Sequence, residues 1–436
     1  MGLQRDFTFL HCADLHLDSP FRGVRSYSPA IAGMLQDAVF KSFERVVDLA
    51  LRERVDFVLL SGDLYDSADR SLSAQLALRR QLLRLSQAGI FVYMVHGNHD
   101  PLSGDRAKLS LPERVFQFKG EVEVCPLYGK NDALIGHIAG YSYPTGDERG
   151  NVAIQMAKAL ESRKGFNVAL LHCNVGGMEG HENYAPCSIE DLRDSSVDYW
   201  ALGHIHRPMI LSCENPLVVY PGTIQGRSVR ETGPRGCYLV TVSAQGSISP
   251  IFYPTDKIRW WEETLDISSV EEEQVLMDTL ENLRGKYRKE AEGRGIMLRV
   301  TLTGNTSLYR RLGRDGFMET LIGELNREEE ALSDFVWIEA IQNKTRPDYS
   351  IENLRKTQTF VGDFLREMDT VRSQIRDNET LFALMDEGLG NGRWRRGDLE
   401  PYLQTLERED IAQILEKAAI KGLDGLLKGE NDPCVS

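Results

Sequence analysis

The sequence FTFLHCADLH, residues 7–16, decides the fold, because an apolar run ends there at a carboxylate and a histidine. The same arrangement recurs four times. VDFVLLS runs into GD at residues 62–63, and IFVYMVH runs into GNHD at residues 97–100. VALL precedes His172, and DYWAL precedes GHIH at residues 203–206. Because ligand sites in α/β proteins assemble at the carboxyl ends of strands, the five segments predict one shared crevice.

Stretches with helical spacing separate these apolar runs. Residues 37–54 and 71–88 have the pattern of amphipathic helices, and they alternate with strands expected at 55–61 and 90–95. This alternation, with continuously apolar strands, predicts an α/β core whose sheets are buried on both faces. A β-rich stretch over residues 217–253 predicts a second sheet packed on the first. We therefore expect a two-sheet sandwich flanked by helices.

The chain of 436 residues is too long for one ordinary core. We expect an α/β domain over residues 1–255, a small α+β domain over 256–345 and a helical C-terminal region over 346–436. The net charge of −14 is uneven, with −3 in residues 1–255 and −11 in residues 256–436. Such acidity argues against a basic surface over the whole protein, but it leaves room for a local basic groove.

The seven cysteines are widely scattered, and no two form a C-x-x-C pair. This pattern predicts reduced thiols, and hence a cytoplasmic protein, rather than disulfides or a thiolate zinc site. The N-terminus has no cleavable apolar segment, and no apolar run approaches the ~18 residues of a membrane span. We expect a soluble protein without a membrane partner.

Seven side chains at the five strand ends suit divalent cations. They are Asp14, His16, Asp63, Asn98, His172, His204 and His206. Asp14 and His16 are two residues apart, as are His204 and His206, so on an extended chain each pair would point the same way. Seven donors suit two metal ions, with Asp63 as the bridging ligand. Imidazole, carboxylate and amide ligands favour manganese, with iron and zinc left open.

Two cations ~3.5–4 Å apart would hold a bridging hydroxide and support an in-line displacement at phosphorus. Each motif alone also has a simpler explanation, because D-x-H, Gly-Asp and even G-N-H-D occur in ordinary turns. Their joint occurrence, each block after its own strand, favours the metal centre.

Taken together, the blocks D-x-H, G-D, G-N-H-D, H and G-H-x-H resemble the pattern of the calcineurin-like metallophosphoesterase superfamily over residues 7–206. Within it the chain looks most like the SbcD-type DNA repair exonucleases, and closest to the YhaO branch. LDSPFRG after His16, LHCNVGG around His172 and the extension over residues 256–436 carry this likeness. The resemblance implies a metallophosphoesterase sandwich, a capping domain over residues 256–345 and a helical region that docks a partner.

The resemblance also assigns roles to single residues. One metal site would consist of Asp14, His16, Asp63 and His206, and the other of Asp63, Asn98, His172 and His204. His99 would stand over the scissile phosphate and stabilise charge or protonate the leaving oxygen. Asp66 would orient His99, with Asp100 as the alternative neighbour and an ordinary turn as the simpler interpretation of Asp66.

The substrate implied is DNA, hydrolysed by an exonuclease in repair. Four arginines would contact its backbone: Arg22, Arg25, Arg227 and Arg230. Trp260 and Trp261 either stack on bases or fill a hydrophobic seam.

The partner implied is an SbcC-like coiled-coil ATPase, and the family also implies a homodimer. A stripe that includes Leu354, Val361, Leu365 and Met368 either docks this ATPase or packs within the chain. Two other functions stay open: a phosphodiesterase or phosphatase for a small soluble phosphoester, and a non-catalytic scaffold for the ATPase.

Overall fold

The computed structural model describes most of the chain. The described residues are 5–19, 28–67, 70–104, 107, 109–178, 182–193, 195–349, 351–374, 414–415, 418–419, 421–423 and 425–426. The chain divides into two compact units. The first comprises Met1–Glu263, Thr279–Val300 and Leu321–Ile341, and the second comprises Thr264–Asp278, Thr301–Thr320 and Gln342–Ser436. The domain boundaries expected near residues 255 and 345 stay a prediction.

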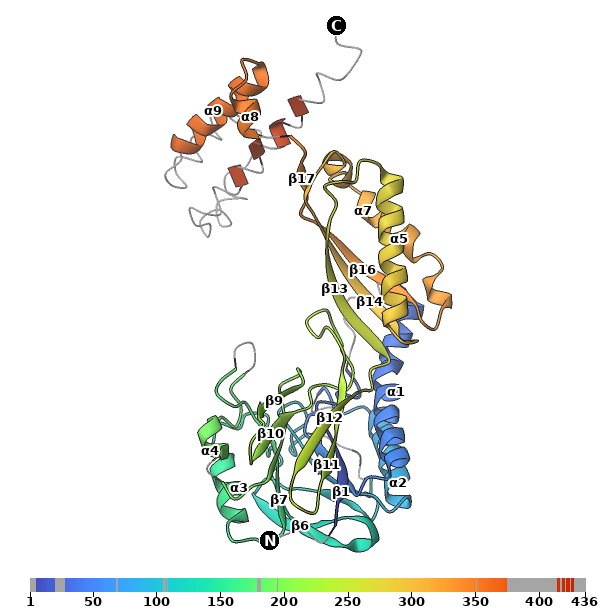
Figure 1. The fold of residues 1–436 in the computed structure, drawn as a ribbon, viewed down its shortest axis with the longest axis vertical. Helices are drawn as coiled ribbons and strands as arrows, with labels where there is room; N and C mark the ends of the chain where they lie inside the picture. Colours follow the sequence, from blue (N-terminus) through green and yellow to red (C-terminus); the bar gives the residue numbers. More distant parts are fainter. Residues whose placement is uncertain are drawn as a thin grey trace. The chain divides into compact units, whose positions relative to one another are not determined.

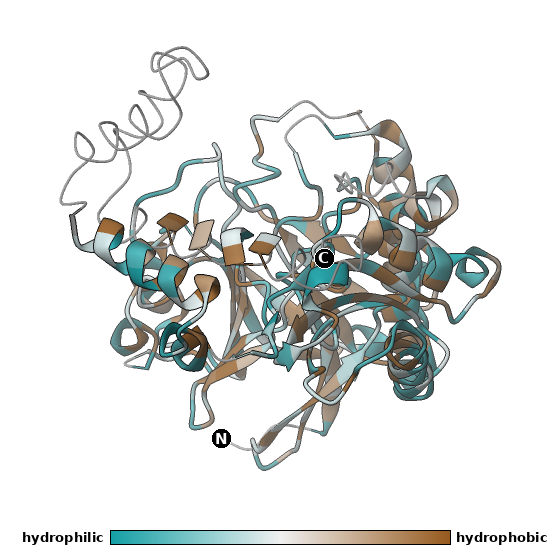
Figure 2. Ribbon diagram, turned by 90° about the horizontal axis from the view of Figure 1, so that it is seen from above, coloured by the Kyte–Doolittle hydropathy of each residue, from teal (hydrophilic) through white to brown (hydrophobic). Residues whose placement is uncertain are grey.

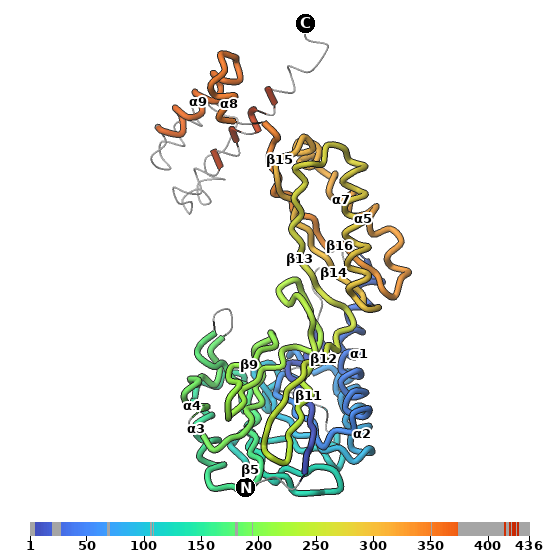
Figure 3. Tube along the Cα trace, in the orientation of Figure 1, coloured from blue at the N-terminus to red at the C-terminus, as the bar shows by residue number. Residues whose placement is uncertain are grey.

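The first sheet has the strand order β12-β11-β1-β2-β3-β4. Its strands are β1 (Phe7–Cys12), β2 (Phe57–Ser61), β3 (Phe91–Val95), β4 (Val115–Gln117), β11 (Gly236–Val242) and β12 (Ile248–Pro254). Strands β1 to β4 run parallel, whereas β11 is antiparallel to both β1 and β12. Strands β1 and β11 are far apart in the sequence and lie side by side (Figure 3).

The second sheet has the order β5-β6-β7-β8-β10-β9. Its strands are β5 (Glu123–Tyr128), β6 (Leu134–Gly140), β7 (Phe166–His172), β8 (Tyr199–Gly203), β9 (Met209–Ser212) and β10 (Leu217–Tyr220). Strands β6, β7, β8 and β10 run parallel. Every residue of β2, β3, β7 and β8 is buried, as expected of strands covered on both faces.

The two sheets pack face to face through an aromatic core. Phe9 stacks on Phe57 with ring centroids 4.8 Å apart, and it meets Tyr199 edge-on at 5.0 Å. Helices α1 (Pro29–Glu53) and α2 (Leu72–Gln87) cover the outer face of the first sheet, and α3 (Val152–Leu160) and α4 (Ile189–Arg193) cover that of the second (Figure 1). The helices carry both hydrophobic and hydrophilic residues, as helices with one buried side do (Figure 2). The expected two-sheet sandwich is confirmed. The expectation that residues 217–253 form the second sheet is wrong for β11 and β12, which join the first sheet beside β1, whereas β10 lies in the second.

Helix α1 begins eight residues before the expected position 37. Ser28 caps it, since its side chain accepts a hydrogen bond from the backbone N of Ile31 at 3.2 Å, and Pro29 occupies the first turn. Our expectation missed this Ser-Pro start signal.

An α+β region follows the sandwich. It contains β13 (Ile258–Asp266), α5 (Glu273–Glu290), β14 (Gly295–Thr303), β15 (Asn305–Thr306), α6 (Tyr309–Leu312), α7 (Phe317–Asn326), β16 (Val336–Asn343) and β17 (Arg346–Pro347). Three of these strands form a sheet of order β13-β14-β16. Strand β13 was not expected.

The described part of the C-terminal region contains α8 (Ile351–Arg355) and α9 (Phe360–Gln374). Val361 and Leu365 are buried against Leu423, and Leu354 packs beside them. This part of the expected docking stripe therefore packs within the chain. No helix among the described residues is both long enough and apolar enough to cross a membrane.

Candidate metal centre

The segments that follow β1 and β2 are joined by backbone hydrogen bonds. Asp14 N donates to the carbonyl oxygen of Gly62 at 3.1 Å, and His16 N donates to that of Asp63 at 3.0 Å. Because β1 and β2 are adjacent parallel strands, these bonds hold three expected ligands together just beyond the strand ends.

The ligand segments are not extended, which corrects our expectation. The backbone angle φ is +50° at Asp14, +45° at His16, +47° at Asp63 and +100° at His204. Left-handed backbone is sparsely populated by residues other than glycine and costs roughly 1–3 kcal/mol per residue. The side chains therefore converge through strained turns rather than through strand alternation.

Two glycines allow the segments to approach one another. A Cβ atom on Gly97 would collide with the Asp63 carboxylate and the His172 ring, and one on Gly203 would collide with the carbonyl oxygen of Ser61. At these positions glycine is required by space, since any side chain would displace a candidate ligand or a strand.

Asp14, His16 and His206 form a first cluster, in which one donor atom of each lies within 4.8 Å of the others. His16 Nε2 and His206 Nε2 are 3.3 Å apart. Two imidazole nitrogens that face one another beside a carboxylate are suited to share a cation. The donor set thus fits a transition metal with nitrogen and oxygen ligands.

A second cluster surrounds His172. Its Nε2 lies 3.1 Å from Asn98 Oδ1 and 3.4 Å from Asp63 Oδ2. Asp63 Oδ2 is also 3.9 Å from His16 Nε2 in the first cluster. One carboxylate oxygen therefore faces donors of both clusters, as a bridging ligand would. The other oxygen, Oδ1, accepts a hydrogen bond from the backbone N of His99 at 3.0 Å.

His204 lies beside the second cluster. Its ring centroid is 5.3 Å from that of His172, and its Nε2 donates to the carbonyl oxygen of Glu182 at 2.8 Å. Its backbone N donates to the Asp14 carboxylate at 3.1 Å. The strand-end loops thus bring all seven expected ligands into one region.

The charges in this region depend on one another. Burial opposes ionisation of Asp63, yet His172 holds the pKa of this carboxyl well below its usual range. Burial also opposes protonation of His172, yet Asp63 and Asp14 raise its pKa to about 9. Metal binding at His172 would therefore release a proton. Burial and the Arg227 guanidinium lower the pKa of His16 to about 3, which keeps this imidazole neutral.

His99 is exposed beside the clusters, and its Nδ1 donates to the backbone carbonyl of Asp66 at 3.0 Å. We expected the Asp66 side chain to orient His99. Its Oδ1 lies instead 2.9 Å from Nδ1 of His16. The backbone of Asp66 thus positions His99, while its carboxylate faces a candidate ligand.

The four arginines expected to contact DNA differ in their exposure and in whether the structure describes them. Arg22 and Arg25 lie outside the described residues. Arg230 is exposed. The Arg227 side chain is only 18% exposed, and its Nη1 donates to Asp66 Oδ1 at 2.6 Å. Contact of these arginines with substrate stays a prediction.

The sequence analysis missed Glu231, which accepts a hydrogen bond from His206 Nδ1 at 2.8 Å. Glu231 lies in VRETGPR, which has the pattern of a polar hairpin. It is not at a regular spacing from His206, so no sequence motif indicates that the two side chains meet. Trp260 is buried, and its Nε1 donates to the carbonyl oxygen of Gly226 at 3.0 Å. Of the two interpretations of Trp260, packing in a hydrophobic seam is therefore favoured over stacking on DNA bases.

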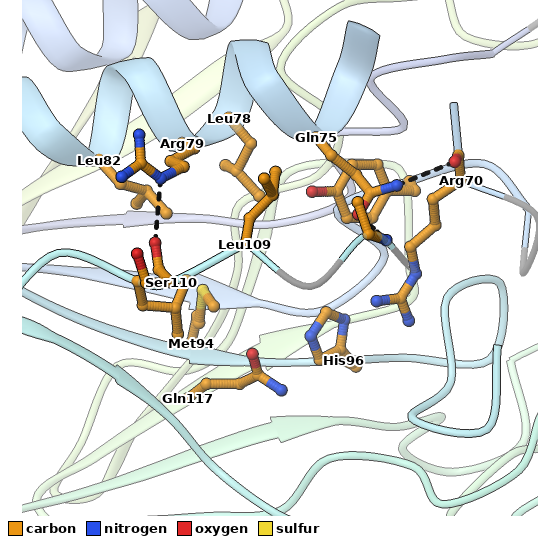
Figure 4. Close-up of a pocket in the computed structure, with 13 residues that line it drawn as sticks. Arg70, Gln75, Leu78, Arg79, Leu82, Met94, His96, Leu109, Ser110 and Gln117 are labelled. Atoms are coloured by element: carbon orange, nitrogen blue, oxygen red, sulfur yellow. Dashed lines mark hydrogen bonds between the residues drawn. The ribbon is translucent and has the colours of Figure 1, made fainter. Parts of the chain in front are cut away.

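A cavity of about 550 Å³ lies between α2 and the strands β3 and β4 (Figure 4). Leu78, Leu82 and His96 form part of its wall. His96 Nδ1 is 2.8 Å from Oδ2 of Asp100, and Asp100 Oδ1 accepts from Gly97 N at 2.8 Å. Asp100 therefore braces the loop of Asn98 rather than His99. None of the seven expected ligands lines the cavity, so it lies outside the metal centre.

Comparison with known proteins gives two family matches. Residues 7–208 match the family described as calcineurin-like phosphoesterase, and residues 260–346 match the middle domain of the metallophosphoesterase YhaO.

Individual relatives extend the likeness over nearly the full chain. The uncharacterised metallophosphoesterase YhaO of Bacillus subtilis is 35% identical over 421 residues, which cover 96% of this chain and 99% of the relative. A DNA double-strand break repair protein Mre11 of Archaeoglobus fulgidus is 24% identical, and the aligned region covers 97% of this chain and 92% of the relative. Its counterpart in Sulfurisphaera tokodaii is 27% identical, and the match spans about half of each chain, 48% and 51%. The chain therefore belongs to the calcineurin-like metallophosphoesterases.

Proposed function

We propose that the chain is a metal-dependent phosphodiesterase that acts on DNA, as an exonuclease in DNA repair. The observation that carries the proposal is the position of Asp63 Oδ2, 3.4 Å from His172 Nε2 and 3.9 Å from His16 Nε2. A shared carboxylate is what a two-cation centre for phosphoester hydrolysis requires. Phosphoester hydrolysis follows from the family, and DNA as substrate is our inference.

The ligands divide between two metals. We assign Asp14, His16, Asp63 and His206 to one, and Asp63, Asn98, His172 and His204 to the other. Manganese is the expected metal, with iron and zinc as alternatives. When bound, such a pair polarises phosphoryl oxygens and makes water a better nucleophile.

His99 supplies the proton chemistry in this proposal. Because its Nδ1 donates to the Asp66 carbonyl, its Nε2 is the ring nitrogen left to face a substrate. When protonated at Nε2, His99 donates that proton to the leaving oxygen. Its exposure lets a bulky substrate reach it.

A cluster of positive charge supports a polyanionic substrate. It consists of Lys41, Arg45, Lys257 and Arg294. Arg45 Nη1 and Arg294 Nε both donate to the carbonyl oxygen of Asp256, at 2.6 and 3.1 Å. Burial and the three neighbouring cations lower the pKa of Lys257. Arg259 binds the Asp256 carboxylate at 2.7 and 2.9 Å, and Arg294 is paired with Asp256 at 3.4 Å and with Glu292 at 2.9 Å. Lys41, Arg45 and Lys257 supply the remaining positive charge, which suits a phosphate backbone.

The relatives named as DNA double-strand break repair proteins also support DNA as the substrate. We further propose an SbcC-like ATPase as partner and a cytoplasmic location. Six cysteines in the described part of the chain are free thiols, which suits a reducing compartment.

The test is a matrix of substrates and metals. Linear, circular and single-stranded DNA and a chromogenic phosphodiester are each incubated with manganese, magnesium or zinc. We expect manganese-dependent digestion of linear DNA that is lost in Asp63→Asn. A protein that binds two metals but cleaves only the chromogenic ester favours the alternative, an enzyme for small phosphoesters. Inactivity on every substrate, with retained ATPase binding, favours a scaffold.

A further inference from the structure

Arg227 joins two carboxylates that come from distant parts of the chain. Its Nη1 lies 2.6 Å from Asp66 Oδ1, and its Nη2 lies 3.1 Å from Glu231 Oε1. The other oxygen of Glu231 accepts a hydrogen bond from the backbone N of Arg227 at 2.8 Å. The three side chains are 18%, 21% and 11% exposed, in the order Arg227, Asp66 and Glu231, so solvent screens these contacts only weakly.

Each carboxylate faces one histidine of the first cluster. Asp66 Oδ1 is 2.9 Å from His16 Nδ1, and Glu231 Oε1 is 2.8 Å from His206 Nδ1. The opposite ring nitrogens, the two Nε2 atoms, are the pair that lies 3.3 Å apart. A carboxylate that accepts from Nδ1, as Glu231 does from His206, keeps the imidazole proton on that side, directs the Nε2 lone pair toward a cation and makes it more basic. Asp66 Oδ1 lies beside His16 Nδ1 outside hydrogen-bond geometry, so it acts on that ring through its charge.

In the part of the chain that the structure describes, the ring nitrogens of the second cluster contact main-chain carbonyls more closely than carboxylates at their outer side, where Asp14 Oδ1 lies 4.0 Å from His172 Nδ1. His172 Nδ1 contacts the carbonyl oxygen of Ser61 at 2.9 Å, and His204 Nε2 contacts that of Glu182 at 2.8 Å. Both partners are neutral backbone groups. In the contacts that the structure describes, carboxylates therefore lie 2.8–2.9 Å from the histidines of the first cluster, and main-chain carbonyls lie 2.8–2.9 Å from those of the second.

We propose that Asp66, Arg227 and Glu231 form a carboxylate clasp, which positions His16 and His206 for one metal ion and leaves the other ion unaffected. The clasp rests on the proposed assignment of the ligands to two metals. The planar guanidinium sets the separation of the two carboxylates, because its fork can bind both at once. A lysine at this position keeps the charge but lacks the fork.

Burial opposes ionisation of both carboxyls, yet their partners hold the pKa of each below its usual range. His16 and Arg227 lower the pKa of Asp66, and His206 and Arg227 lower that of Glu231.

The test measures manganese binding to the purified full-length chain by calorimetric titration, with bound metal counted by elemental analysis. We expect two ions in the wild type. In Glu231→Ala and Asp66→Ala, one ion should bind roughly 10–100-fold more weakly while the other keeps its affinity. Glu231→Gln should lose less, because the amide oxygen still accepts from His206. The control is Arg114→Gln, which removes a half-buried arginine paired with Asp132, outside both clusters.

Equal weakening of both ions, or no change in either, would overturn the clasp. If an alanine variant fails to fold, Arg227→Lys replaces it, and we expect the same loss at one ion only. A wild type that binds fewer than two ions contradicts the metal assignment itself, and this result appears before any variant is made.

Discussion

Replacing His99 with alanine tests the proposed proton donor. The ring is exposed, so its loss leaves no buried cavity, and the backbone N that donates to Asp63 Oδ1 at 3.0 Å is retained. The metal ligands should therefore stay in place. Removal of a general acid lowers the rate about 10²–10⁴-fold. At about 1.36 kcal/mol per factor of ten, this is ~2.7–5.4 kcal/mol of transition-state stabilisation.

The assay compares kcat/KM for DNA with kcat/KM for a chromogenic phosphodiester, both with manganese. A leaving group that is stable as an anion needs no proton, so the chromogenic ester should lose less than about tenfold. The control is His137→Ala, because His137 Nδ1 makes a similar exposed contact, 3.1 Å from the Lys164 carbonyl. Equal losses on both substrates, or loss of bound manganese, would refute a role in protonating the leaving oxygen.

Three further outcomes follow from other parts of the molecule. Lys257→Gln should weaken DNA binding and make the plot of log affinity against log salt concentration less steep by about 1. Lys119→Gln, which removes an exposed lysine, should change neither the affinity nor the slope. Filter binding across a salt series measures both quantities. Leu59→Ala, in the core between the sheets, should lower the free energy of unfolding by about 2–5 kcal/mol, and Leu134→Ala, at 56% exposure, should change it little, as denaturant titration can verify. Burial lowers the pKa of His11 from 6.5 to about 3. Below pH 6.5 the His11 side chain therefore stays neutral in the folded state but takes up a proton in the unfolded state. Stability should then fall as the pH drops below 6.5, by up to about 1.4 kcal/mol per pH unit from this group, and the fall should be shallower in His11→Asn.

The fold and the ligand set could be predicted because both depend on local patterns. An apolar run such as residues 57–61 must be covered on both faces, and a polar residue at its end must lie at the sheet edge. Five strand ends of this kind are enough to predict a sandwich with a shared crevice, because no long-range contact has to be known. Strand β13, with its charged residues Arg259, Glu262 and Glu263, lacks that signal, so its partners in the sheet decide its conformation.

The support of the ligands could not be predicted, because it depends on contacts between distant segments. Asp66 and Arg227 are 161 residues apart, and each is unremarkable in its own turn. The left-handed backbone of Asp14 and His16 is likewise imposed by hydrogen bonds to the loop after β2. Sequence spacing told us which residues meet, but it could not say which nitrogen of each ring points inward.

The strain in the candidate metal centre argues against a scaffold. Asp14, His16, Asp63 and His204 all have left-handed backbone, and none is a glycine. Burial raises the pKa of Asp14, and the neighbouring Asp63 raises it further, although His172 and His206 oppose this rise. A centre of this kind destabilises the metal-free fold, because strained residues and adjacent buried carboxylates both raise its free energy. A chain that needed only the shape of the sandwich would be more stable with glycine in these turns and with no paired acids. Bound cations offset the repulsion of the carboxylates, so the strained residues are best explained by metal binding and the chemistry it supports.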